Sequence, residues 1–243
     1  MIQSIKSSVR WAFRAAGYDV HRRKPPEPGS DPYLDMRRLV VPSRRDVTIF
    51  DVGANIGQTI QRFREIFPQP TIHAFEPGGD AFDALRVNCS RLAGVYINNM
   101  ALGPQPGTQE FIENTNSDMS SFLEPGDECW GTVKRRTLVT MITIDDYCRQ
   151  HCIETIDILK SDTQGFDLEV LKGARRLFAQ HRIHLVYLEV IFGKLYKNSA
   201  QLSEIYEFLS ERGFDLVSFY KIYYINGLAK WTDALFVNQQ YDI

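Results

Sequence analysis

Cysteine is scarce in this chain of 243 residues, which has four: Cys89, Cys129, Cys148 and Cys152. Small secreted domains that depend on disulfides use far more cysteine for their length, so we expect no disulfide framework. Cys148 and Cys152 stand four positions apart, but no second ligand pair follows at the spacing of a zinc site. The sequence therefore predicts reduced thiols and no metal site.

An excess of charge of one sign is also absent. The chain has 28 basic and 30 acidic residues, a formal net charge of −2 and a pI of about 6.2. Proteins that bind nucleic acid rely on a basic field to attract phosphates, so we expect no nucleic-acid partner. The sequence does not indicate an oligomeric state.

No stretch approaches the roughly 18 apolar residues of a membrane-spanning helix. Near the N-terminus Lys6, Arg10 and Arg14 interrupt the apolar positions, so the segment does not resemble a signal peptide, and we expect a cytoplasmic protein. Residues 2–16 nevertheless have the apolar spacing of a helix with a basic face. Such a helix either packs on its own domain or makes weak membrane-surface contact through residues 1–24, and the sequence leaves both open.

Strand and helix patterns alternate from about residue 46 onward. Alternation of this kind predicts an α/β fold, a mostly parallel sheet with helices on both faces and an antiparallel strand on or near one edge. We expect a helical or linker extension at 1–45, with a short helix over 31–41, and one domain at 46–243. Residues 103–131 are the longest irregular section, with a hairpin strand at 108–112. The expected strands are 47–52, 71–75, 95–98, 138–142, 156–161, 184–191, 214–220 and 234–237. The expected helices are 58–67, 81–92, 144–150, 167–179 and 200–211.

A glycine loop follows the first of these strands. Asp51 ends the strand, Gly53 and Gly57 lie in the loop, and Glu76 ends the next strand 25 positions after Asp51. Open parallel sheets bind a nucleotide-like ligand in this way, because glycine lets the backbone approach and the second acid accepts the ribose hydroxyls. The third glycine of a dinucleotide site is absent. This favours a ligand with a ribose and no phosphate, of which S-adenosylmethionine is the common one.

Further carboxylates follow later strands. Asp162 and Glu189 lie at the ends of strands 156–161 and 184–191, on the same predicted rim as Asp51 and Glu76. A carboxylate within reach of an alcohol can take its proton, so Asp162, and after it Glu189, are the candidate bases. The alternative is that Asp162 only positions the cofactor or a loop. None of the five histidines lies at such a strand end, and no G-x-S-x-G motif occurs.

The segment 156–174 resembles the signature I-D-x-L-K-x-D-x-x-G-x-E-x-x-V-L-x-G-A of FkbM-family methyltransferases, with Asp167 where the family usually has glutamate. The D-V-G-A-N-x-G loop at 51–57, the F-E-P at 75–77 and the N-x-A-L-G at 99–103 are similar to further motifs of that family. The resemblance covers residues 48–178 well and the C-terminal part loosely.

This resemblance implies the class I methyltransferase fold, a seven-stranded Rossmann-like sheet, with S-adenosyl-L-methionine as the cofactor. It also implies O-methylation of a hydroxyl on a sugar, glycolipid or polyketide. One subgroup of the family methylates fucose on lipochitooligosaccharide nodulation signals, which would make this chain a 2-O-methyltransferase of a fucosyl residue. The cofactor-binding residues implied by position are Asp51, Gly53, Asn55 and Gly57 in the loop, Glu76 at the ribose, Asn99 and Ala101 near the adenine, and Gln164 with Asp162 near the methyl group.

Two other functions fit parts of the pattern. A nicotinamide-dependent oxidoreductase could use a similar sheet, although the third glycine is missing. A cofactor-binding protein without catalysis would keep the loop and not need Asp162. A set of aromatic residues either stacks on a sugar acceptor or fills the core: Trp130, Phe219, Tyr220, Tyr223, Tyr224 and Trp231.

Overall fold

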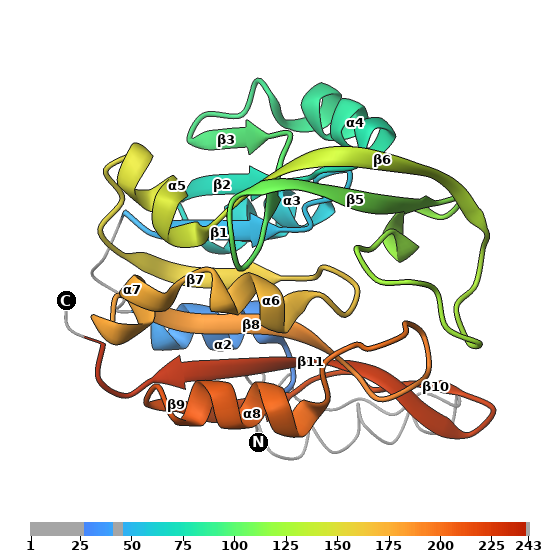
Figure 1. Ribbon diagram of the computed structural model, residues 1–243. Coiled ribbons are helices and arrows are strands. Elements are labelled where there is room, and N and C mark those ends of the chain that lie inside the picture. Colours follow the sequence, from blue (N-terminus) through green and yellow to red (C-terminus); the bar gives the residue numbers. More distant parts are fainter. Residues whose placement is uncertain (1–26, 41–45, 242–243) are drawn as a thin grey trace, which may run out of the picture.

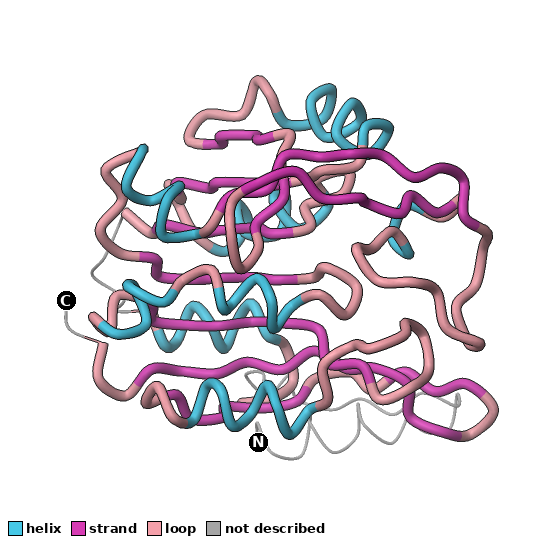
Figure 2. The backbone as a smooth tube through the Cα atoms, viewed as in Figure 1, coloured by secondary structure: helices cyan, strands magenta, loops and turns pink. Residues whose placement is uncertain are grey.

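The computed structural model describes residues 27–40 and 46–241, and a single large sheet runs through their centre (Figures 1 and 2). The sheet has eight strands in the order β10-β11-β8-β7-β1-β2-β3, with β9 paired to β11. Its strands are β1 (Thr48–Val52), β2 (Thr71–Phe75), β3 (Val95–Asn98), β7 (Ile156–Ser161), β8 (Ile183–Ile191), β9 (Phe214–Phe219), β10 (Tyr223–Ile225) and β11 (Leu228–Asn238).

The sheet is parallel from β3 to β8, and β11 pairs antiparallel with β8, β9 and β10. The expected class I methyltransferase fold is confirmed, including the antiparallel strand near one edge. The eighth strand is β10, which turns into β11 through Asn226 and Gly227, both with positive φ. From β1 the chain first adds β2 and β3 on one side, then returns to add β7 and β8 on the other. Ligands bind at such a switch point, here between β1 and β7.

Helices cover both faces of the sheet, as predicted. In Figure 1, α5 to α8 lie in front of the sheet and α2 and α3 behind it. The helices are α2 (Pro32–Leu39), α3 (Gln58–Ile66), α4 (Gly79–Cys89), α5 (Ile144–Gln150), α6 (Asp167–Lys172), α7 (Arg175–Ala179) and α8 (Leu202–Ser210). Alternate residues of a strand point to opposite faces, so Phe50 packs in the core under α5 to α8 while Ile49 packs in the core with α2 to α4.

The helix expected over 167–179 is in fact two helices, α6 and α7. Gly173 ends α6, and a Cβ atom there would lie 2.3 Å from the backbone oxygen of Gly103, so only glycine allows this close approach. The second helix has its own cap, because Asp145 accepts hydrogen bonds from the backbone nitrogens of Arg176 at 2.7 Å and Leu177 at 3.2 Å. A tertiary contact therefore decides the break.

A second sheet forms at the edges of the irregular section expected over 103–131. It consists of β4 (Ala101–Leu102), β5 (Gly107–Asn114) and β6 (Val133–Ile142) in the order β4-β6-β5. The predicted hairpin strand at 108–112 is confirmed and extends over 107–114, although residues 107–110 are exposed. The strand predicted over 138–142 begins earlier, at Val133, and most of 115–131 is irregular, as expected.

The short helix expected near residues 31–41 is α2. Asp31 caps it by accepting hydrogen bonds from the backbone nitrogens of Tyr33 and Leu34. Met36 is fully buried in the core with α3, so α2 packs on the domain. The helix predicted over 2–16 lies outside the described residues. Within 27–40 and 46–241, no helix has the length and apolar character needed to cross a bilayer, and all four cysteines are free, as expected.

Replacing Phe50 by alanine should lower the free energy of unfolding by about 3–5 kcal/mol, because a large buried ring leaves a cavity. Phe50 is fully buried, and its ring centroid lies 5.4 Å from that of Phe75 and 5.7 Å from that of Tyr147. Urea denaturation measures the change. Val87→Ala is the control, since Val87 is 80% exposed and should change stability by no more than about 0.5 kcal/mol. Equal effects of the two variants would contradict the described core.

Candidate functional site

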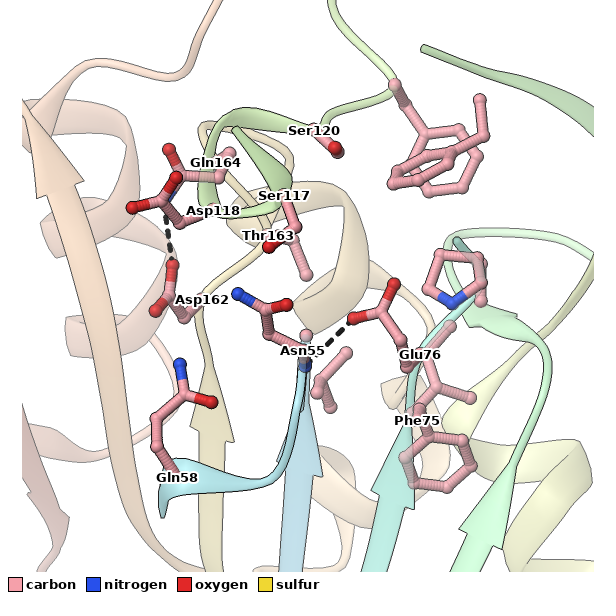
Figure 3. A pocket seen from close by; sticks show the side chains of 17 residues that line it. Asn55, Gln58, Phe75, Glu76, Ser117, Asp118, Ser120, Asp162, Thr163 and Gln164 are labelled. Atoms are coloured by element: carbon pink, nitrogen blue, oxygen red, sulfur yellow. Dashed lines mark hydrogen bonds between the residues drawn. The ribbon is translucent and has the colours of Figure 1, made fainter. Parts of the chain in front are cut away.

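A cavity with an empty volume of about 630 Å³ opens at the C-terminal ends of β1, β2 and β7. Figure 3 shows Glu76 on one side, Asp162 and Gln164 on the other, and Asn55 between them. Six of the predicted site residues line it: Gly53, Asn55, Glu76, Ala101, Asp162 and Gln164. Four do not: Asp51, Gly57, Asn99 and Glu189. The structure therefore separates the predicted residues that line the cavity from those that lie behind its wall.

Gly53 lies where three strands come together. Its backbone nitrogen and that of Ala54 both donate to the oxygen of Phe75 at 3.0 Å. Its φ is 74°, and a Cβ atom would lie 1.9 Å from the backbone oxygen of Asp162. A side chain at this position is therefore excluded both by conformation and by space. Gly57, with φ of 93°, turns the chain into α3, and a Cβ atom there would lie 2.5 Å from the sulfur of Cys89.

Asp51 is fully buried beneath this loop and forms an ion pair with Lys160. The Lys160 ammonium lies 2.9 Å from Oδ1 of Asp51 and donates to the Gly53 oxygen at 3.0 Å. Burial opposes the charge of Lys160, but the carboxylates of Asp51 and Asp162 outweigh it and raise the lysine pKa. The pair ties β1 to β7 at the switch point. Sequence patterns assigned no role to Lys160, although its place in the methyltransferase signature could have marked it.

Glu76 presents its carboxylate to the cavity with both oxygens held. The backbone nitrogens of Asn55 and Gly78 donate to Oε2 and Oε1 at 2.9 and 2.8 Å. Burial raises the pKa of Glu76 to about 7, against these two hydrogen bonds. Asn99 does not line the cavity. Its amide donates to the backbone oxygens of Glu76 at 3.0 Å and Pro77 at 3.3 Å. Asn99 therefore shapes the turn that carries Glu76.

Asp162 and Glu189 occupy different surroundings. The Asp162 side chain is 44% exposed and lines the cavity, whereas Glu189 is buried behind Gln164. The Gln164 amide nitrogen donates to Asp162 Oδ1 at 2.9 Å and to Glu189 Oε2 at 3.1 Å. Burial, reinforced by the neighbouring charge of Asp162, raises the pKa of Glu189 well above its usual value.

The β5–β6 hairpin supplies one wall of the cavity. Its cavity-lining residues are Phe111 on β5 and Ser117, Asp118, Ser120 and Phe122 in the connection to β6. The hairpin is fastened over the site by Arg135, whose guanidinium binds Glu113 on β5 at 2.6 Å and Asp80 on α4 at 3.2 Å. In sequence, Ser120 and Ser121 resemble a serine-bearing loop of the FkbM family. Sequence patterns did not single out the other four residues, because only the fold of the hairpin brings them to the cavity.

A buried polar atom of the cavity wall has no partner among the described residues. Oδ1 of Asn55 accepts no hydrogen bond from them. Buried polar groups are normally paired, so this atom indicates a polar ligand. Among the residues of the two described ranges, no three histidine, cysteine, aspartate or glutamate side chains are arranged to hold a metal ion.

The aromatic residues near the C-terminus stack largely on one another. The rings of Tyr223 and Trp231 are 4.6 Å apart and nearly parallel, and Trp130 lies 5.4 Å from Trp231. The ammonium of Lys221 lies 4.4 Å from the Tyr223 ring. Most ring faces of this stack are therefore covered, while Trp130 is 37% exposed.

Lys160→Met should lower the free energy of unfolding by about 3–5 kcal/mol, because it leaves Asp51 charged and buried without a partner. Adding Asp51→Asn should restore part of the loss, since the unpaired charge is then removed. Urea denaturation of both variants measures this coupling. Lys172→Met is the control, because Lys172 pairs with Glu169 at the surface and such pairs contribute about 0–1 kcal/mol. A similar small change for Lys160→Met would show that the buried pair does not stabilise the loop.

Comparison with known proteins places this site in a family. A model described as the methyltransferase FkbM domain matches residues 51–216. The 2-O-methyltransferase NoeI of Sinorhizobium fredii is 26% identical over 198 residues, which are 76% of this chain and 80% of that protein. The hexuronic acid methyltransferase AglP of Haloferax volcanii is 28% identical over 159 residues, 65% of this chain and 62% of that protein.

Among solved structures, magnesium protoporphyrin IX methyltransferase from Synechocystis with bound SAM aligns over 96% of this chain and 97% of that one. The identity is 10% and the TM-score 0.46. The family model, in contrast, spans more than half of the chain and begins at Asp51 in the glycine loop. The chain belongs to the FkbM family and is an S-adenosylmethionine-dependent methyltransferase.

Proposed function

We propose that the protein transfers the methyl group to a hydroxyl of a sugar or glycolipid acceptor. The observation that carries this proposal is one cavity with two unlike acids, the buried Glu76 and the half-exposed Asp162. The names of NoeI and AglP, a 2-O-methyltransferase and a hexuronic acid methyltransferase, support an oxygen of a sugar as the acceptor atom. Following NoeI, the finer proposal is 2-O-methylation of a fucosyl residue.

The residues of the cavity fit S-adenosylmethionine. Glu76 has lone pairs left for the two ribose hydroxyls, and Asn55 Oδ1 is an unused acceptor for the amino group of the methionine part. Gly53 provides the close backbone approach, supported from behind by Asp51 and Gly57. Ala101 and the ring of Phe111 offer apolar surface to the adenine, with Asn99 holding the adjacent turn. When bound, this cofactor supplies an electrophilic methyl group.

Asp162 would act as the general base. Its carboxylate accepts the proton of the acceptor hydroxyl as that oxygen bonds to the methyl carbon and the bond from carbon to sulfur breaks. A positioned base contributes about 10²–10⁴-fold to such a step, and alignment of oxygen, carbon and sulfur contributes more. The ammonium of Lys160 lies 3.9 Å from Oδ2 of Asp162.

Family membership disfavours the nicotinamide-dependent oxidoreductase. The same membership disfavours a cofactor-binding protein without catalysis. The cytoplasmic location and the weak membrane contact through residues 1–24 stay predictions.

Glu76→Ala should weaken binding of S-adenosylhomocysteine at least tenfold, because a hydrogen bond to a charged group contributes about 1.5–3 kcal/mol. Calorimetric titration measures the loss, with Glu65→Ala on the exposed side of α3 as control.

Ribose hydroxyls favour ionised Glu76, whose pKa in the free protein is about 7. Wild-type affinity should therefore rise from pH 6 to pH 8, by up to about tenfold per pH unit below pH 7. Glu76→Gln should remove this dependence, and a variant that keeps it would contradict the ribose contact.

Asp162→Asn should reduce turnover by about 10²–10⁴-fold while S-adenosylhomocysteine still binds, because the amide cannot take the proton. Transfer of a labelled methyl group to methyl glycosides, including a fucoside and a glucuronoside, measures turnover. Asp83→Asn, at an exposed position of α4, is the matched control. Unchanged turnover in Asp162→Asn would rule out Asp162 as base, and wild type that binds cofactor yet methylates no glycoside would oppose the sugar acceptor.

A further inference from the structure

Gln164 lies at the centre of a hydrogen-bond network beside the cavity. Both protons of its amide are used, one toward Asp162 Oδ1 at 2.9 Å and one toward Glu189 Oε2 at 3.1 Å. Its amide oxygen accepts a hydrogen bond from the Tyr196 hydroxyl at 2.8 Å. The opposite orientation would turn that oxygen toward two carboxyl groups, so the tyrosine fixes which way the amide faces.

The backbone of this loop is equally constrained. Gln164 has a φ of 56°, which is uncommon for a residue other than glycine. Its backbone oxygen accepts a hydrogen bond from the hydroxyl of Ser121 at 2.8 Å. A Cβ atom on the next residue, Gly165, would lie 3.0 Å from Ser199 and 3.2 Å from Leu123. Segments from the second sheet and from the loop after β8 therefore hold Gln164 in an unfavourable conformation, which is common at functional sites.

Glu189 is not placed to meet an acceptor. It is 9% exposed, does not line the cavity, and faces Gln164. Besides Asp162, the acidic groups near it are Asp167 of α6 and Asp233, its cross-strand neighbour on β11. Burial first, and then these three negative charges, raise its pKa and so favour the protonated, uncharged acid. An uncharged acid cannot accept a proton from an alcohol.

We propose that Gln164 is a positioning residue that aims Asp162 at the acceptor hydroxyl, and that Glu189 anchors Gln164 without taking the proton itself. This inference rests on the proposed function. Glu189, Tyr196 and Ser121 each bind a different atom of Gln164, so its amide is left one direction in which to donate to Asp162. Without that bond, the half-exposed Asp162 side chain would be free to adopt other rotamers.

Two substitutions of Glu189 test the proposal, with methyl fucoside and methyl glucuronoside as acceptor probes. Glu189→Leu removes the anchor and should lower kcat by about 10–100-fold, part of the 10²–10⁴-fold that a base supplies. Glu189→Gln keeps an uncharged acceptor oxygen, so it should restore kcat to within about threefold of wild type and leave the pH–rate profile unchanged. S-adenosylhomocysteine affinity should be unaltered in both. The control is Glu169→Gln, at a surface pair with Lys172.

A base at Glu189 predicts the opposite pattern, because Glu189→Gln would then be as inactive as Asp162→Asn. That result would overturn the proposal. So would Glu189→Leu with full turnover, since the anchor would then have no effect on Asp162.

A second measurement needs no acceptor. Carbon-13 NMR of protein labelled at glutamate carboxyl carbons, in complex with S-adenosylhomocysteine, reports the protonation of Glu189, assigned by the signal lost in Glu189→Gln. A protonated carboxyl at pH 7.5 supports the uncharged anchor, and an ionised one overturns it. If no glycoside is methylated, the proposal of a sugar acceptor is wrong. The NMR measurement still decides whether Glu189 is an uncharged anchor.

Discussion

The ion pair between Asp51 and Lys160 is the interaction on which the site depends. Both groups are buried, and they come from the two strands that meet at the switch point of the sheet. Two charges removed from water are costly unless each is paired, so β1 and β7 are constrained to this register. Lys160 also binds the Gly53 oxygen, and Gly53 in turn packs against the backbone of Asp162. The ion pair thus holds both the glycine loop and the backbone of the proposed base, Asp162.

Around this pair, four acids at one rim have different surroundings. Asp51 is neutralised by Lys160, and Glu76 is held by two backbone nitrogens in a buried turn. Asp162 is half exposed at the cavity, while Glu189 is enclosed behind an amide. Residues of one chemical type can therefore serve binding, positioning and proton transfer, because burial and partners set the charge of each.

Much of the fold followed from local patterns. Strands 71–75, 95–98 and 156–161 and the helix 144–150 match the predicted bounds, because apolar runs and the cap at Thr143 are local signals. The prediction of one helix over 167–179 failed because a contact distant in sequence, between Gly173 and Gly103, ends the first helix. The strand predicted over 108–112 extends over 107–114, where pairing with β6 holds its exposed half as a strand.

The sequence by itself determined the sheet class, the glycine loop, the acids at the strand ends and the family, since these depend on neighbours along the chain. Only the tertiary structure decided which of these acids face the cavity. The tertiary structure places Phe111 and Ser120 in the cavity wall and Gln164 between Asp162 and Glu189. The physical reason is that strand-end position fixes the rim on which a side chain lies, whereas its burial and partners come from segments far away in sequence.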